Sequence, residues 1–415
     1  MTTQSSSPSR WRFDTLALHG GDDPAYHPLG AHLPPIFPTT TYTFPDVETA
    51  RATFAGERPG YVYARRGHPN ADLMARKIAL LEAFDFLQDG MPEDNAAHGL
   101  VFASGMAAIT AAILARAQKA DVILAPRVIY GTTYAFFTHV LPQWGLRVVW
   151  VDQGDLDAWE RAFREHVRVT WAYIETPANP TLDITDIAGV VEIAHRYGAW
   201  VIADNTFATP YCQRPLALGV DVVVHSTTKY LSGHGQALGG AVISRDRDYI
   251  TGPLLRMLLV LGGVMAPFEA WMTTMGMKTF ALRMARHCEN ARTVAEYLAQ
   301  HPKIARVYYP GLPDFPGHEI AKRQMHCFGG MVSFELKGGY DAGVRLMNSL
   351  RLPALGVSLG KTDSIIEHPA SMTHAKIPPE ERRAMGISDG LVRFSVGLEA
   401  AEDILADLDQ ALARI

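Results

Sequence analysis

Between residues 100 and 229, short apolar runs alternate with segments of helical periodicity, and this alternation limits the folds that the chain can adopt. A strand, a helix and a second strand in succession favour parallel pairing, because the helix carries the chain back along one face of the sheet. The alternation therefore predicts an α/β fold whose mostly parallel sheet is covered on both faces. The expected strands are 100–103, 122–125, 147–151, 170–175, 200–204 and 222–224, and the expected helices include 71–86, 187–197 and an Ala-rich one that ends near Lys119.

Beyond about residue 270 the pattern changes to one of long helices and antiparallel strands, which predicts a smaller α+β domain. The proline-rich residues 1–60 predict an extended arm of the kind that lies on a neighbouring subunit, and the polar residues 88–99 predict an exposed loop. We expect an arm over 1–67, a large domain over 68–270 and a small C-terminal domain over 271–415. The small domain should contain helices at 271–299, 341–350 and 400–413 and strands at 306–310, 330–336 and 391–396.

The charge and cysteine content exclude several classes of protein. A net charge of −5 argues against a nucleic-acid binder, which should be basic. The three cysteines are far apart in sequence and form no Cys-x-x-Cys pair, which argues against a disulfide framework or a zinc site. No uncharged apolar run reaches the roughly 18 residues of a membrane span. We expect a soluble cytoplasmic protein that uses neither metal nor membrane.

The most informative stretch is the apolar run 222–224 followed by Ser226, Thr228 and Lys229. Burial at the end of a strand lowers the pKa of a lysine, and a neutral amine is a nucleophile toward aldehydes. The two hydroxyls can donate to a phosphate group. Lysine and phosphate donors together indicate pyridoxal 5'-phosphate (PLP), held as a Schiff base by the large domain. The alternative is an ordinary surface lysine after a strand.

Other strand ends and helix starts supply groups that fit this cofactor. Ser104 and Gly105 precede the Ala-rich helix, whose first N–H groups and positive dipole end form a phosphate site. Asp204 ends a predicted strand, as do Glu175 and Lys229, so all three should meet at the carboxyl edge of the sheet. A carboxylate at Asp204 can pair with the pyridinium nitrogen, whereas its ordinary interpretation is a helix cap.

Tyr130, Arg393 and the arginines of residues 61–70 each have one functional and one ordinary interpretation. Tyr130 can stack on a cofactor ring or fill the core, and Arg393 can bind a substrate carboxylate bidentately or form a surface ion pair. The arginines of residues 61–70 can bind an anion or belong to a surface loop. The joint occurrence of these residues with Lys229 and Asp204, in this order, favours the functional interpretations.

Motifs along nearly the whole chain beyond the arm resemble the Cys/Met-metabolism family of PLP-dependent enzymes. That family includes cystathionine γ-lyase, cystathionine β-lyase, cystathionine γ-synthase, methionine γ-lyase and the homoserine-ester sulfhydrylases. The matching segments are 61–65 (Tyr-Val-Tyr-Ala-Arg), 104–106 (Ser-Gly-Met), 130–133 (Tyr-Gly-Thr-Thr), 175–180 (Glu-Thr-Pro-Ala-Asn-Pro), 203–207 (Ala-Asp-Asn-Thr-Phe), 225–234 (His-Ser-Thr-Thr-Lys-Tyr-Leu-Ser-Gly-His), 358–360 (Ser-Leu-Gly), 368–374 (His-Pro-Ala-Ser-Met-Thr-His) and 391–399 (Leu-Val-Arg-Phe-Ser-Val-Gly-Leu-Glu).

The resemblance implies an aspartate-aminotransferase-like fold, a homotetramer built from two dimers with shared active sites, and a role for each matching residue. Lys229 is implied as the Schiff-base lysine and proton shuttle, Asp204 as the partner of the pyridinium nitrogen, and Tyr130 as the stacking tyrosine and acid toward the leaving group. The remaining implied roles are the phosphate cup (Ser104, Gly105, Met106, Ser226, Thr228), the pair that reaches the phosphate of the neighbouring subunit (Tyr63, Arg65), the neighbour of the ring oxygen (Asn179) and the carboxylate grip (Ser358, Arg393).

Within the family, residues 366–374 and 379–393 most resemble methionine γ-lyases, which predicts γ-elimination from an amino acid. Methionine, homocysteine, cystathionine or an O-linked analogue such as canavanine would give 2-oxobutanoate or a homoserine-level product, ammonia and the leaving group. Two departures concern the substrate pocket: Thr132 replaces a usual cysteine, and an ungapped match places Leu258 and Leu259 where a Lys-Asp pair is usual. We therefore expect a preferred substrate other than methionine. A cystathionine β-lyase, a γ-replacing synthase or sulfhydrylase, and a catalytically silent binding protein remain as alternatives.

Overall fold

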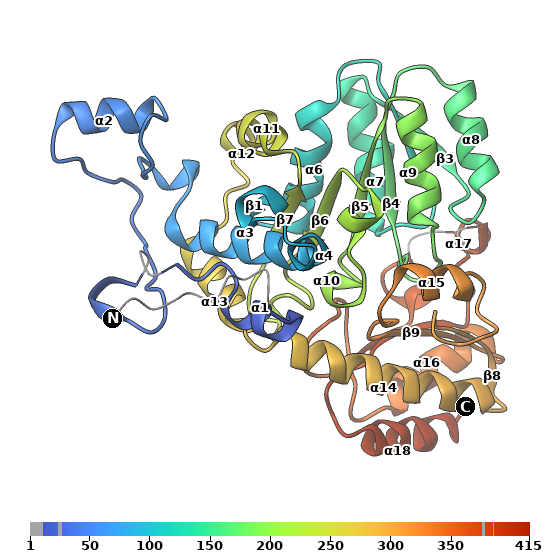
Figure 1. Cartoon of the computed structure of the whole chain (residues 1–415). Coiled ribbons are helices and arrows are strands. Elements are labelled where there is room, and N and C mark those ends of the chain that lie inside the picture. The colour runs from blue at the N-terminus through green and yellow to red at the C-terminus, as the bar shows by residue number, and fades with distance from the viewer. Residues whose placement is uncertain (1–10, 24–26, 376–377, 385) are drawn as a thin grey trace.

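The chain is organised around two sheets, a larger one that lies between helices and a smaller one near the C-terminus (Figure 1). The computed structural model describes residues 11–23, 27–375, 378–384 and 386–415. The polar residues 1–10 lie outside this description. Among the described residues, no helix has both the length and the apolar character needed to cross a membrane.

The larger sheet has seven strands in the order β1-β7-β6-β5-β4-β2-β3. Strands β3, β2, β4, β5 and β6 pair in parallel, whereas β7 is antiparallel to both of its neighbours. The prediction of a mostly parallel sheet is confirmed, and β7 is the strand that the sequence pattern missed. The bounds are β1 (His98–Phe102), β2 (Val122–Pro126), β3 (Arg147–Val151), β4 (Val169–Glu175), β5 (Trp200–Asp204), β6 (Val222–Ser226) and β7 (Gly240–Ser244).

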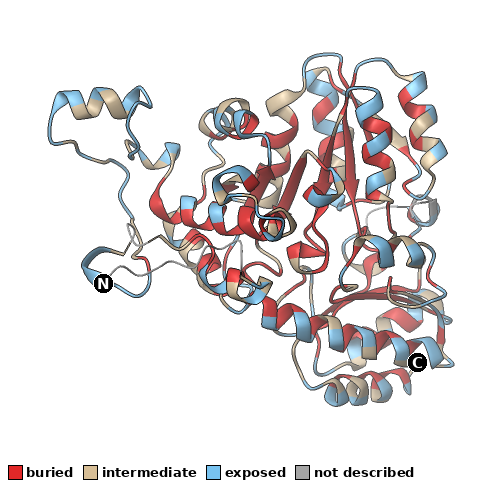
Figure 2. Cartoon of the chain, viewed as in Figure 1, coloured by how far each residue is buried: buried red, intermediate tan, exposed pale blue. Residues whose placement is uncertain are grey.

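Helices cover both faces of this sheet, because successive strand residues point to opposite sides. On β6, Val223 belongs to one buried apolar cluster, whereas Val222 and Val224 belong to another. Both clusters consist of buried residues, which is why the central strands are largely apolar (Figure 2). The helices are α3 (Pro69–Glu82), α4 (Phe84–Gln88), α6 (Gly105–Arg116), α7 (Gly131–Ala135), α8 (Leu156–Glu165), α9 (Ile187–Arg196), α10 (Thr209–Cys212), α11 (Arg247–Tyr249) and α12 (Leu255–Leu261).

The smaller sheet has five strands in the order β10-β11-β12-β9-β8 and its own buried apolar cluster. The expected antiparallel pairing of the strands near 306–310 and 330–336 is confirmed by β8 and β9. The bounds are β8 (Ile304–Tyr308), β9 (Met331–Leu336), β10 (Ala354–Leu355), β11 (Ile365–Glu367), β12 (Leu391–Ser395), α14 (Phe280–Gln300), α15 (His318–Gln324), α16 (Gly339–Ser349), α17 (Pro379–Ala384) and α18 (Ala401–Leu412). The division into an arm and two domains stays a prediction.

Three local predictions are corrected. The arm is not wholly extended: α1 (Phe13–His19) buries Leu16 in the core, and α2 (Val47–Phe54) projects from the body with no buried residue (Figures 1 and 2). The segment 88–99 contains the short helix α5 (Glu93–Ala96) and the start of β1, because β7 supplies its pairing partner. The helical stretch 271–299 is two helices, α13 (Pro267–Met277) and α14, separated at Lys278 and Thr279.

Candidate active site

A cavity of about 560 Å³ lies at the carboxyl ends of β4, β5 and β6 and is closed on its other side by residues of the C-terminal part of the chain. Its volume falls within the usual range for a small-molecule site. The structure brings most of the predicted site residues to its wall. These are Ser104, Gly105, Met106, Tyr130, Thr132, Asn179, Asp204, Ser226, Thr228, Lys229, Ser358 and Arg393.

Lys229 follows β6 and donates a hydrogen bond from Nζ to Ser358 Oγ at 2.8 Å. Burial and the positive charge of Arg393 lower the pKa of Lys229 to about 8, because both disfavour its charged form. Ser358 has a φ of 84°, a conformation that is uncommon for a residue with a side chain and that occurs often at functional sites. The structure thus supplies a lysine that is partly neutral near neutral pH, as a nucleophile requires.

Asp204 ends β5 and is buried at the base of the cavity. Its Oδ1 accepts a hydrogen bond from the Thr206 N–H at 3.0 Å, and its Oδ2 accepts one from the Tyr173 hydroxyl at 3.4 Å. Burial raises the pKa of Asp204, against the opposing effect of the Thr206 hydrogen bonds. A protonated ring nitrogen beside Asp204 would keep the Asp204 carboxyl group in its ionised form.

Glu175, at the end of β4, connects the two loops that carry Tyr130 and Asn179. Its Oε2 accepts the Tyr130 N–H at 2.9 Å, and its Oε1 accepts the Asn179 N–H at 3.1 Å. Burial raises the pKa of Glu175, and the nearby Asp204 carboxylate raises it further. Glu175 is therefore a positioning residue. In the sequence, its place at the end of a predicted strand is the feature that indicates it.

The start of α6 forms a concave surface against β6. Ser104 caps the helix by accepting the Ala107 N–H at 3.1 Å. A Cβ on Gly105 would lie 2.8 Å from Ser226 Cβ, so only glycine lets the helix come this close. The first N–H groups of a helix have no intrahelical partner. Among the described residues the Ser226 hydroxyl makes no hydrogen bond that would compete with a ligand. Thr228 lines the same wall, with its hydroxyl bonded to the backbone of Gly239.

Arg393 lies on β12 and is held from three sides. Its Nη1 donates to Asn179 Oδ1 at 3.1 Å, its Nη2 donates to the Ser358 carbonyl at 2.8 Å, and Nη1 also lies 3.1 Å from Glu367 Oε1. Its Nε is buried without a hydrogen-bond partner in the described chain. A buried donor without a partner is costly, so this group fits a ligand carboxylate.

Glu367 is a cavity residue that the sequence analysis missed. It lies on β11, directly opposite Arg393 in the antiparallel pair with β12. Its Oε1 faces Arg393, whereas its Oε2 is buried and unpartnered among the described residues. The available signal was an acidic residue at the end of the apolar run 365–367, but its partner depends on the pairing of two strands that are distant in sequence.

Four residues do not line the cavity of their own chain. Tyr63 and Arg65 belong to the exposed arm, where Arg65 Nη1 donates to the Leu259 carbonyl at 2.9 Å. Their implied role in a neighbouring subunit stays a prediction. Leu258 is buried in a core cluster, and Leu259 lies beside it on α12. The ungapped match therefore does not put this leucine pair around the substrate of its own subunit.

The residues of the cavity fit PLP. The start of α6 and Ser226 can hold the phosphate, because Gly105 removes the Cβ that would fill this space. The buried Asp204 can hold the ring nitrogen, and Lys229 offers an amine for the aldehyde. Tyr130 is exposed at the mouth of the cavity and is available to stack on the ring.

Comparisons with known proteins agree with this geometry. The family model described as Cys/Met metabolism PLP-dependent enzyme matches residues 14–413. The L-methionine gamma-lyase of Fusobacterium nucleatum subsp. nucleatum is 45% identical, over 97% of this chain and 98% of its own. The cystathionine beta-lyase of Coxiella burnetii is 42% identical, over 96% of this chain and 97% of its own.

The crystal structure of cystathionine gamma synthase from Xanthomonas oryzae pv. oryzae in complex with aminoacrylate and cysteine has a TM-score of 0.88 to this chain. The two are 37% identical, and the match covers 97% of this chain and 98% of that one. These likenesses confirm the expected aspartate-aminotransferase-like α/β fold and the expected cofactor, PLP. The chain belongs to the family of PLP-dependent enzymes of cysteine and methionine metabolism.

Proposed function

We propose that the chain is a γ-lyase, which removes the γ-substituent of an α-amino acid to give 2-oxobutanoate or a homoserine-level product, ammonia and the leaving group. The observation that carries the proposal is that Lys229, Asp204 and Arg393 line one cavity. The similarity to an L-methionine gamma-lyase supports γ-elimination in particular. The candidate substrates are methionine, homocysteine, cystathionine and O-linked analogues such as canavanine.

Each residue of the cavity has a defined task in this reaction. Arg393 and Ser358 hold the substrate carboxylate and so fix the Cα–H bond near Lys229. The neutral amine of Lys229 removes the Cα proton and moves a second proton at Cβ. PLP, when bound, supplies the electron sink for the carbanion at Cα, and Asp204 keeps its ring nitrogen protonated. The hydroxyl of Tyr130 then protonates the group that departs from Cγ.

Glu367 favours a leaving group that carries N–H donors. Its unpartnered buried Oε2 is a better acceptor for an ammonium or guanidinium group than for a methylthio group. Cystathionine and canavanine have such groups beyond Cγ, whereas methionine has none. A site built around a buried polar group rejects analogues that leave it unpaired.

A panel of the candidate substrates, compared by kcat/KM, tests the proposal. We expect cystathionine or canavanine to exceed methionine by at least about tenfold, which corresponds to 1.4 kcal/mol in transition-state binding. The variant Glu367→Gln should lower kcat/KM for cystathionine and canavanine more than that for methionine, and so reduce this preference. A tenfold preference for methionine in the wild type would contradict the proposed selectivity.

β-Elimination is the second candidate, because a cystathionine beta-lyase of Coxiella burnetii is also similar over nearly the whole chain. It needs the same first deprotonation by Lys229 and differs in that the group leaves from Cβ. A γ-replacing synthase or sulfhydrylase would use a second nucleophile at Cγ. Turnover of an O-acylhomoserine that depends on added thiol would favour that reaction.

The proposal includes a homotetramer in the cytoplasm, whose dimers share active sites. The exposed arm supports this assembly, since α2 has no buried residue within its own chain. Tyr63 and Arg65 lie outside the cavity of their own subunit, as residues that serve a neighbouring site would.

A further inference from the structure

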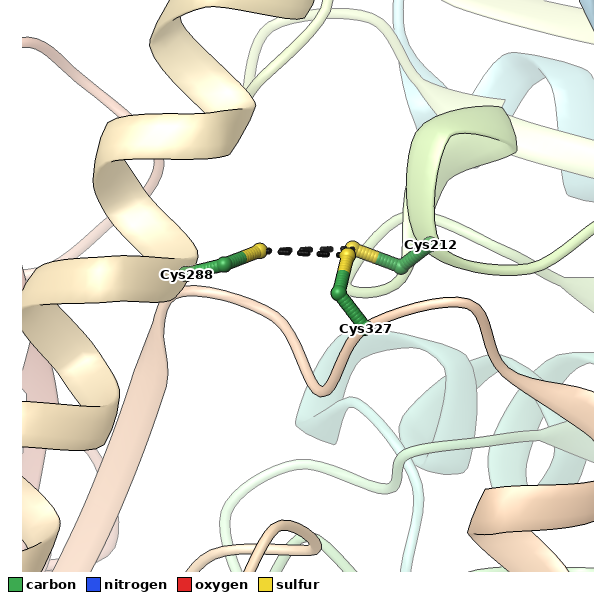
Figure 3. Close-up of side chains that lie close together, drawn as sticks. All are labelled: Cys212, Cys288 and Cys327. Atoms are coloured by element: carbon green, nitrogen blue, oxygen red, sulfur yellow. Dashed lines mark hydrogen bonds between the residues drawn. The ribbon is translucent and has the colours of Figure 1, made fainter.

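All three cysteines of the chain meet at one point of the fold, although they are far apart in sequence. Cys212 ends α10, Cys288 lies on α14, and Cys327 lies in the loop before β9. Figure 3 shows their sulfur atoms pointing toward one another from these three segments. The Sγ–Sγ distances are 2.9 Å for Cys212 and Cys327, 3.3 Å for Cys288 and Cys327, and 3.7 Å for Cys212 and Cys288. We call these residues the thiol cluster.

The geometry of the thiol cluster suits a metal ion. Sulfur atoms that each lie about 2.3 Å from one ion are roughly 3.8 Å apart in tetrahedral coordination. The distance between the sulfurs of Cys212 and Cys288 is already close to this value. The two shorter distances would reach it if the Cys327 sulfur moved outward. That sulfur is carried by a loop, which can move more easily than α10 or α14.

The chemistry of the donors restricts the type of ion. Among the described residues, the group within mutual ligand distance contains thiols alone, with no imidazole or carboxylate. Thiolates select soft ions, whereas Mg²⁺ and Ca²⁺ require oxygen ligands. Cys212 is buried, and Cys288 and Cys327 are half-buried, so an ion can enter from the side of α14 and the loop.

We propose that Cys212, Cys288 and Cys327 bind one soft, thiophilic metal ion through three thiolate sulfurs. Each thiol that coordinates the ion loses its proton. The ion joins α10, which belongs to the large-sheet region, to α14 and to the loop before β9. The loop is already docked on α10 by a hydrogen bond from the His326 N–H to the Cys212 carbonyl at 2.7 Å. Because the ion binds the folded chain, it stabilises the packing of the two sheets against each other.

The test uses the PLP-loaded enzyme after reduction with a phosphine. The reductant is then removed in the absence of oxygen, and a thiol assay must show three free thiols per chain. Cd²⁺ is the probe. We expect one Cd²⁺ per chain after dialysis, a thiolate-to-metal charge-transfer band in the ultraviolet, and a higher Tm. A large excess of Mg²⁺ should displace none of the Cd²⁺.

Variants separate the thiol cluster from other cation sites. Cys327→Ser should weaken Cd²⁺ binding at least 100-fold and remove most of the charge-transfer band. If that variant fails to retain PLP, Cys288→Ser takes its place and should show the same two losses. The matched control, His326→Gln, replaces the neighbouring imidazole and should keep both the Cd²⁺ affinity and the charge-transfer band. Wild-type protein with three free thiols and no bound Cd²⁺, or equal binding by the serine variants, would overturn the proposal. Loss of Cd²⁺ in His326→Gln would overturn the all-sulfur ligand set.

Discussion

At the scale of single residues, Lys229 is the group whose ionisation the cavity controls most directly. Its pKa is lowered to about 8 by burial and by Arg393, while Glu367 acts in the opposite direction. Only the neutral amine can attack the aldehyde of PLP. The rate at which the apoenzyme takes up PLP should therefore rise with pH, reach half of its maximum near pH 8 and level off about one pH unit higher. An ordinary lysine would reach half of its neutral form only at about pH 10.4.

This pH profile is measured by the absorbance change when PLP is mixed with apoenzyme. Glu367→Gln removes a carboxylate that favours the ammonium form, so its plateau should begin at a lower pH than that of the wild type. A wild-type rate that still rises between pH 9 and 10 would show that Lys229 has an ordinary pKa.

Gly105 gives a second residue-scale prediction. In Gly105→Ala, the new Cβ would lie 2.8 Å from Ser226 Cβ and 3.1 Å from Ser226 Cα, so the start of α6 must move away from β6. We expect the affinity for PLP, measured by equilibrium dialysis, to fall by roughly tenfold or more, since phosphate contacts at a helix start depend on close backbone approach. Gly131→Ala is the matched control: Gly131 also lines the cavity and starts a helix, but its Cβ would meet no atom within 4 Å. Equal losses in the two variants would contradict this account.

At the scale of elements, α14 holds the turn that follows Lys229. The buried Arg283, in the first turns of α14, donates to the carbonyls of Tyr230 at 2.7 Å, Leu231 at 3.3 Å and Gly276 at 2.8 Å. Arg283→Leu would leave these carbonyls without their donor. Each buried group left unpaired costs about 1–3 kcal/mol, so we expect a loss of about 3 kcal/mol in the free energy of unfolding. Urea denaturation of the apoenzyme measures it.

Arg286→Leu on the same helix is the control for this loss. The Arg286 side chain is 52% exposed and pairs with the exposed Glu289, and exposed pairs of this kind contribute at most about 1 kcal/mol. A similar loss in both variants would mean that the carbonyl contacts of Arg283 do not stabilise α14 against the turn.

Periodicity predicted the strands of the larger sheet well, because buried parallel strands are apolar throughout. It missed β7, whose residues 240–244 are mostly small and whose antiparallel pairing depends on β1 and β6. It also joined α13 and α14, since neither Lys278 nor Thr279 is a strong helix breaker. Proline content suggested an extended arm, but Leu16 and Ala17 gain enough burial against the core to hold α1.

At the scale of the whole molecule, the site combines residues from nearly the entire chain. The strand-end rule groups Glu175, Asp204 and Lys229 from the sequence alone, because it depends only on parallel topology. The place of Glu367 opposite Arg393 depends on the pairing of β11 with β12, and the thiol cluster depends on how α10, α14 and one loop pack. Neither arrangement has a spacing signal in the sequence.

The shared-site assembly predicts complementation between subunits. Arg65→Ala should weaken PLP retention, and mixing it with Lys229→Ala protein should restore part of the activity after subunit exchange, because each mixed dimer contains one site with both residues intact. Activity of the mixture against that of each variant alone is the measurement. Arg66→Ala, the exposed neighbour, is the control and should retain PLP. Proven exchange without rescue would show that each subunit completes its own site.

Whether this cavity performs γ-elimination is decided by the keto acid that the enzyme forms from cystathionine. Cleavage at Cγ gives 2-oxobutanoate, ammonia and cysteine, whereas cleavage at Cβ gives pyruvate, ammonia and homocysteine. We predict 2-oxobutanoate from the PLP-loaded wild type and neither keto acid from Lys229→Ala, which keeps the cavity but lacks the amine that moves the protons. Pyruvate as the main product, or undiminished turnover by Lys229→Ala, would contradict the account.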